Sequence, residues 1–151
     1  MTDVFLDSDV IMDFLLKREK FAVHAAMIFA LGERRTLRLH TSTLSFLNVN
    51  YIAESRIGRR DSARLIRTLR SLITLLPVDE RTVDWALAKG GGDLEDHVQY
   101  RAATDGGVSF FVTRNTSDYP KEPSFVMTPE LFLKTLPGSP HSPRTGRRKT
   151  T

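Results

Sequence analysis

The sequence of 151 residues contains no cysteine. This absence excludes disulfide bonds, thiolate metal ligands and a cysteine nucleophile, and it gives no reason to expect an oxidising compartment. The chain also has no apolar run long enough to span a membrane, and its first residues, MTDVFLDSDV, include no cationic leader. We therefore expect a cytoplasmic protein that has no association with a membrane.

Acidic residues are missing from the end of the chain, where none follows Glu130. Four of the 22 Lys and Arg residues lie beyond position 136, and the other 18 equal the 18 Asp and Glu residues, so the net charge of +4 belongs to this end. Residues 137–151, PGSPHSPRTGRRKTT, have no apolar residue to bury, and we expect them to form a disordered basic tail. Residues 1–136 have the usual length of one domain.

Apolar runs typical of buried strands alternate with segments of helical periodicity. The strand-like runs are VFL at 4–6, LRLHTS at 37–42, ITLLPVD at 73–79, VSFFVTRN at 108–115 and PSFVMT at 123–128. Helices are predicted after Asp7, over 22–33, from Ser42 or Ser45 to about Ile57, over 60–72 and 80–89, from Asp93 to about Thr104, and over 129–136. This alternation predicts an α/β fold of three layers, with a mostly parallel central sheet and helices on both faces.

Acidic and amide side chains follow two of the predicted strands, and ligands of an open parallel sheet bind outside the carboxyl ends of its strands. Each of these residues also has an ordinary structural explanation, as a helix cap or a turn residue. A converging set needs a cation, because two carboxylates 4 Å apart repel by about 4 kcal/mol at an effective dielectric constant of 20. The candidates are Asp7 and Asp9 after the first strand, Asn115 and Asp118 after the fourth, and Asp93 and Asp96 at the start of a helix.

The donor chemistry of this set favours one kind of metal. Oxygen ligands without cysteine indicate Mg²⁺ or Mn²⁺. The four histidines, His24, His40, His97 and His141, show no paired ligand spacing, which argues against zinc.

Three segments resemble the signature segments of PIN-domain proteins, and in particular the VapC-like toxins of toxin–antitoxin systems. They are FLDSDVIMDFLLKR at 5–18, GDLEDHVQYRAA at 92–103 and FFVTRNTSDY at 110–119. The resemblance extends in order from about residue 3 to residue 135. It implies a PIN-like nuclease domain over 1–136, an RNA substrate, hydrolysis of phosphodiester bonds and a protein antitoxin, and it makes a homodimer plausible.

The resemblance also implies roles for individual residues. Asp7, Asp96 and Asp118 would bind the metal directly or through water, and Asn115 would complete the catalytic set by helping to position the attacking water. Thr113 and Arg114 are close enough in sequence to touch the scissile phosphate, although Arg114 has the alternative of pairing with one of the acids.

Two positions depart from the family pattern. The family usually has Asn where Asp9 stands, and usually has Glu in the helix after the second strand, at the position of Asn48. The extra carboxylate of Asp9 either strengthens the attraction for a metal or disturbs its geometry. Because Asn48 is uncharged, only Asp7, Asp96 and Asp118 remain as charged metal ligands. Asp9, Asp93 and Asn48 would then be auxiliary residues around them.

A stripe of arginines offers a surface for RNA or an acidic partner. Arg56, Arg60, Arg64 and Arg67 recur at spacings of four, four and three, so they share one face if their two helices meet nearly end to end. The ordinary explanation is the solvated face of an amphipathic helix. The functional interpretation is a phosphate track beside the acidic site.

Two other functions fit parts of the sequence. An apolar strand followed by Asp7, Ser8 and Asp9 also opens phosphatases of the haloacid-dehalogenase type, in which Asp7 would be the nucleophile. Lys89 lies too close to Asp93 for that pattern, and the segment TRNTSDY would have no role. The second alternative is a PIN-fold module that binds RNA or protein with a weakened catalytic site, as Asn48 and Asp9 suggest.

Overall fold

The computed structural model describes residues 1–122 and 124–138. Apart from Pro137 and Gly138, the predicted basic tail lies outside the described residues. Five strands occur in the described chain: β1 (Thr2–Leu6), β2 (Leu37–Ser42), β3 (Ile73–Leu76), β4 (Phe110–Val112) and β5 (Val126–Met127). The helices are α1 (Ser8–Leu15), α2 (Ala22–Glu33), α3 (Thr43–Ile57), α4 (Arg59–Leu72), α5 (Glu80–Lys89), α6 (Leu94–Asp105), the 3₁₀ helix η1 (Thr116–Asp118) and α7 (Pro129–Thr135).

The strands form one sheet in the order β3-β2-β1-β4-β5, and every pairing is parallel. The chain adds β2 and β3 on one side of β1 and then crosses to place β4 on the other side. Strand order therefore reverses between β1 and β4, and their carboxyl ends flank the crevice in which open α/β sheets bind ligands. The predicted α/β fold is confirmed, with a sheet that is parallel throughout.

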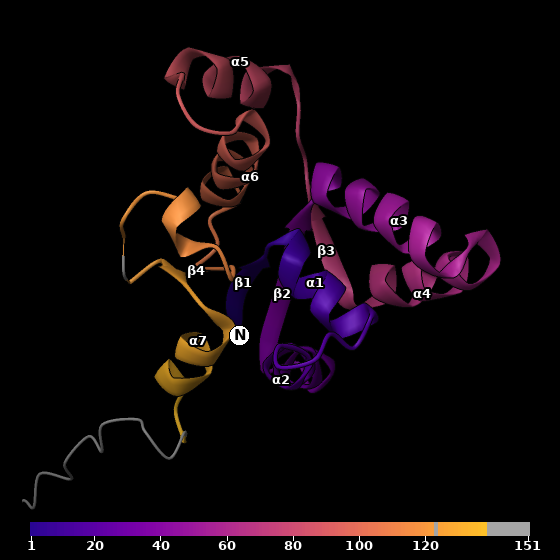
Figure 1. Ribbon diagram of the computed structural model, residues 1–151. Helices are drawn as coiled ribbons and strands as arrows, with labels where there is room; N and C mark the ends of the chain where they lie inside the picture. Colours follow the sequence, from indigo (N-terminus) through magenta and orange to yellow (C-terminus); the bar gives the residue numbers. More distant parts are fainter. Residues whose placement is uncertain (123, 139–151) are drawn as a thin grey trace, which may run out of the picture.

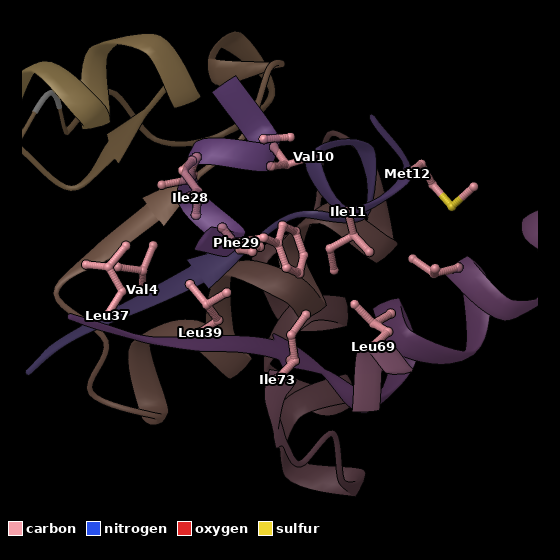
Figure 2. Close-up of a cluster of buried hydrophobic side chains, with 14 of the residues drawn as sticks. Val4, Val10, Ile11, Met12, Ile28, Phe29, Leu37, Leu39, Leu69 and Ile73 are labelled. Atoms are coloured by element: carbon pink, nitrogen blue, oxygen red, sulfur yellow. The ribbon is translucent and has the colours of Figure 1, made fainter. Parts of the chain in front are cut away.

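Alternation along the central strands gives each face of the sheet its own core. Val4 and Leu6 of β1 point to the larger cluster, which α1, α2, α3, α4 and α7 cover. Figure 2 shows part of this cluster, where Val4, Leu37 and Leu39 of the sheet lie beneath Phe29 and Ile28 of α2. Phe5 points to the opposite face and stacks on Phe111 of β4, with ring centroids 4.7 Å apart. The helix α6 contributes Ala103 to that second core, with α5 packed against α6 (Figure 1).

Local sequence signals explain where most helices begin. Ser42, Asp79, Asp93 and Thr128 each cap a helix by accepting a hydrogen bond from a backbone amide of its first turn. These caps agree with the predicted helix starts, and Ser42 rather than Ser45 is the cap of α3. The acid of Asp93 therefore has the structural role that its position at a helix start suggested.

The arginine stripe is not continuous, because α3 and α4 do not meet end to end. Gly58 ends α3 with φ of +83°, and α4 folds back along α3 as the second arm of a helical hairpin (Figure 1). Arg60, Arg64 and Arg67 are exposed on α4, whereas Arg56 lies in the last turn of α3. The expected four-arginine face was wrong for this reason, and a set of three remains.

Among the helices of the described residues, none has the length and apolar character needed to span a membrane.

Candidate active site

Asp7 stands at the point where the sheet order reverses. Its backbone amide donates to the carbonyl of Val112 over 3.0 Å, which joins the end of β1 to the end of β4. Its carboxylate caps α1, since Oδ1 accepts from the amide of Ser8 at 2.7 Å. The other oxygen, Oδ2, accepts from the hydroxyls of Thr113 and Tyr119, each at 2.9 Å. Asp7 is thus both the helix cap and a group held by three elements.

Asp96 reaches the same place from the other face of the sheet. It lies in the first turn of α6, where its amide donates to the capping Asp93 at 3.1 Å. Its Oδ1 is 3.2 Å from the Tyr119 hydroxyl, which also contacts Asp7. One hydroxyl group therefore joins the two carboxylates that the sequence placed in the metal set.

Burial and like charge both act on Asp96. Desolvation is the larger cause and neighbouring carboxylates, those of Asp93, Asp7 and Asp118, add to it, so that the pKa of Asp96 is raised to about 6. Burial and the charges of Asp7 and Asp96 raise the pKa of the Tyr119 phenol well above its ordinary value. At neutral pH the phenol is therefore a neutral hydrogen-bond donor.

Asp9 is the extra acid of the site, and the loop after β4 holds it. Its Oδ2 accepts from the amide of Arg114 at 3.1 Å and from the side-chain amide of Asn115 at 3.3 Å. Burial first, and then the charge of Asp7, raise the pKa of Asp9 to about 6. The additional carboxylate thus serves as an anchor for residues 113–115, with a negative charge next to Asp7.

The loop after β4 brings together three more of the candidates. Thr113 is buried and donates to Asp7, whereas Asn115 is exposed and donates to Asp9. Asp118 lies exposed on η1, close enough for its charge to raise the pKa of Asp96. Arg114 points away to α1, where its guanidinium pairs with Asp13. The alternative in which Arg114 pairs with an acid is therefore the one that the structure adopts, and that acid lies outside the candidate set.

Asn48, at the position of the family's second acid, contacts a carboxylate. Its side-chain amide donates to Oε1 of Glu95 over 2.7 Å, from α3 to the first turn of α6. The sequence offered no signal for Glu95 beyond its place next to Asp96. Tyr119 was also missed, because an aromatic residue after a strand is usually part of a core.

The oxygen donors of the site suit a hard divalent cation. Within the described residues, no three His, Asp or Glu side chains converge closely enough to form a ready coordination set. Asp7 and Asp96 form the pair, and Asp118 supplies a third charge nearby. This arrangement fits Mg²⁺ or Mn²⁺, because Mg²⁺ is commonly held by one or two carboxylates while waters and substrate phosphate complete its shell.

The fold and these carboxylates define an α/β protein with an acidic site at the switch point of a parallel sheet. The chain belongs to the PIN-domain family, whose model matches residues 3–117. The resemblance of the three sequence segments is thereby confirmed, and membership of this family replaces the phosphatase interpretation. A comparison with curated proteins finds no match.

Solved structures share the fold at low sequence identity. A chain of the DNA-bound VapBC complex of Salmonella typhimurium is 18% identical, with a TM-score of 0.63, over 85% of this chain and 99% of that chain. A toxin–antitoxin complex from Klebsiella pneumoniae gives 17% identity and a TM-score of 0.59, over 83% of this chain and 97% of that chain. The sarcin–ricin-loop-cleaving toxin VapC20 of Mycobacterium tuberculosis is 13% identical, with a TM-score of 0.58, over 72% of this chain and 86% of that chain.

Proposed function

We propose that the protein is a Mg²⁺- or Mn²⁺-dependent endoribonuclease that acts as the toxin of a toxin–antitoxin pair in the cytoplasm. The observation that carries the proposal is the meeting of Asp7 and Asp96 at one hydroxyl, at the switch point of the sheet. Membership of the PIN-domain family supports it, as does the similarity of the fold to a chain of a toxin–antitoxin complex and to a sarcin–ricin-loop-cleaving toxin.

Different residues of this chain would bind the metal and orient the attacking water. Asp7 and Asp96 would hold the cation, with Asp118 as the third acid, and Asn115 would help orient a water at the exposed mouth of the site. A bound cation would lower the pKa of water and neutralise charge that develops on the phosphodiester. Thr113 serves Asp7 as a buried donor, which keeps one carboxylate oxygen in a fixed direction.

Two exposed surfaces of the protein suit RNA and protein partners. Arg60, Arg64 and Arg67 form an exposed cationic row on α4 that RNA phosphates or an acidic antitoxin segment would contact. On α3, Leu47 and Tyr51 lie one turn apart and are 65% and 77% exposed. These two side chains are our candidates for the contact with an antitoxin or with a second copy of the chain.

A binding module with a weakened site is the second candidate function. The observation in its favour is that, over the described residues, no three acidic or imidazole side chains form a ready metal set. The two functions differ in their response to metal, since only the nuclease requires it for its effect on RNA.

The test is cleavage of total RNA, with single-stranded DNA as the second substrate. The nuclease account expects RNA fragments only when Mn²⁺ or Mg²⁺ is present, and none from Asp7→Asn. RNA that is bound and left intact at millimolar Mn²⁺ would identify the binding module instead.

A further inference from the structure

Tyr119 occupies a fixed position at the centre of the candidate site. Its side chain is 5% exposed, and its ring packs on Phe111 of β4 with centroids 4.5 Å apart. The ring of Tyr100 lies on another side, with centroids 6.5 Å apart. Because its neighbours belong to the second core, the ring has little freedom to move, and its hydroxyl is a fixed point towards which flexible side chains orient.

The single O–H of Tyr119 faces two carboxylates that come from opposite faces of the sheet, so its one proton is shared between them. The hydroxyl is 2.9 Å from Oδ2 of Asp7 and 3.2 Å from Oδ1 of Asp96. Asp7 has other donors in Ser8 and Thr113. In the part of the chain that the structure describes, the carboxylate of Asp96 has no donor besides Tyr119. The orientation of Asp96 therefore depends on this one contact.

Without the hydroxyl, nothing described in the protein would hold the two carboxylates towards each other. Like charges repel, and an Asp side chain in the first turn of a helix can turn to solvent by changing its rotamer. Two carboxylates share a cation well only when their oxygens already face a common point, since ordering them afterwards costs entropy.

We propose that Tyr119 is a positioning residue, whose hydroxyl turns the carboxylates of Asp7 and Asp96 towards one place, where they would share one divalent cation. The inference rests on the proposed function, because it assumes that these two carboxylates are the metal ligands.

Two other roles make different predictions for the same substitution. A hydroxyl that only fills the place of the cation would compete with the metal, so its removal would tighten metal binding. A hydroxyl with a purely structural role would change the melting temperature and leave metal affinity unaltered. A positioning hydroxyl makes metal binding weaker when it is removed.

The test is Tyr119→Phe, which keeps the buried ring, with Tyr100→Phe as the matched control. Tyr100 packs against the same ring, but its hydroxyl donates to Glu122 at an exposed position. Mn²⁺ affinity is measured by isothermal titration calorimetry on proteins freed of metal, and melting temperature is measured alongside it. We expect Tyr119→Phe to bind Mn²⁺ about tenfold more weakly than the wild type, and Tyr100→Phe to bind it as the wild type does.

The possible results separate this inference from the proposed function. Equal or tighter binding by Tyr119→Phe, or equal weakening by both variants, would overturn the positioning role while leaving the nuclease proposal standing. Failure of the wild type itself to bind Mn²⁺ would overturn the metal-dependent function, and the positioning role with it.

Discussion

Asp13, buried in α1, forms an ion pair with the half-buried Arg114 of the loop after β4. The guanidinium Nε lies 2.7 Å from Oδ2 of Asp13, and a second nitrogen donates to Oδ1 at 3.1 Å. Asp13 is 1% exposed, and the guanidinium also lies over the ring of Phe21, 4.0 Å from its centroid. Since the amide of Arg114 donates to Asp9, the pair fixes the loop that carries Thr113 and Asn115 to the candidate site.

We expect Arg114→Ala to destabilise the protein by about 1–3 kcal/mol, because the buried carboxylate of Asp13 loses its closer cation and keeps only Arg18, at 3.6 Å. The matched control is Arg101→Ala, which removes a more exposed pair with Asp105 and should cost less than about 1 kcal/mol. Urea denaturation of both variants measures the difference. Equal losses of stability would show that burial of the Asp13 pair has no special cost.

The stability of metal-free protein should depend on pH through Asp96. Its pKa rises from 3.8 to about 6 on folding, so the stabilisation that it contributes is complete below pH 3.8 and is lost as pH rises through about 6. Asp96→Asn carries no charge and should match the wild type at pH 4. At pH 8 it should be more stable by about 1 kcal/mol, after a discount for partial exposure, or about 2–4 °C in melting temperature.

Thermal melts in EDTA at pH 4, 6 and 8 measure this difference, and the titrating groups far from Asp96 cancel between the two proteins. A gap between the proteins that stays constant across these pH values would contradict the assignment of the shift to Asp96. Added Mn²⁺ should reverse the order at pH 8, because a metal bound only by the wild type stabilises only the wild type.

Gln99 links the helix of Asp96 to the helix of Asn48. It is 1% exposed, accepts a hydrogen bond from the Ser42 hydroxyl and donates one to the Ser45 hydroxyl. Gln99→Leu leaves two buried hydroxyls without this partner, so we expect a loss of about 1–3 kcal/mol in urea denaturation. Thr104→Val, at an exposed position of the same helix, is the control. Equal stability of the two variants would show that the hydrogen bonds of Gln99 to Ser42 and Ser45 do not stabilise the contact between α6 and α3.

Local signals in the sequence were sufficient for most of the fold. Helix caps depend on a few neighbouring residues, so Asp79, Asp93 and Ser42 could be recognised without tertiary information. Strand runs such as ITLLPVD were also found, although the ordered strand β3 is shorter, at Ile73–Leu76. Asp7 could be found because it follows a strand of a parallel sheet, whereas Asp96, in the first turn of a helix, was paired with it through the resemblance to PIN-domain proteins.

Features that depend on long-range contacts could not be predicted. The bridge from Tyr119 to Asp7 joins residues 112 positions apart, and the contact of Asn48 with Glu95 joins residues 47 apart. The arginine stripe failed for a local reason with a large effect, because the backbone of Gly58 reverses the direction of the chain. The spacing of the arginines does not predict the direction in which the chain continues after Gly58.

The three arginines of α4 should contribute to RNA binding through counterion release. In an Asp96→Asn background, we expect the triple substitution Arg60→Ala, Arg64→Ala and Arg67→Ala to reduce the slope of log K against log salt by about 2. The double substitution of two exposed arginines elsewhere, Arg34→Ala and Arg81→Ala, is the control. Fluorescence anisotropy with labelled RNA measures both slopes. An unchanged slope in the triple variant would show that these three arginines do not contact RNA phosphates.

Cleavage of total RNA by the wild type and by Asp96→Asn, each with Mn²⁺ and with EDTA, tests the central claim most directly. Asp84→Asn, which changes an exposed acid of α5, controls for loss of charge alone. The account predicts fragments only from the wild type and Asp84→Asn, and only with Mn²⁺. Equal cleavage by Asp96→Asn, or cleavage that persists in EDTA, would contradict it.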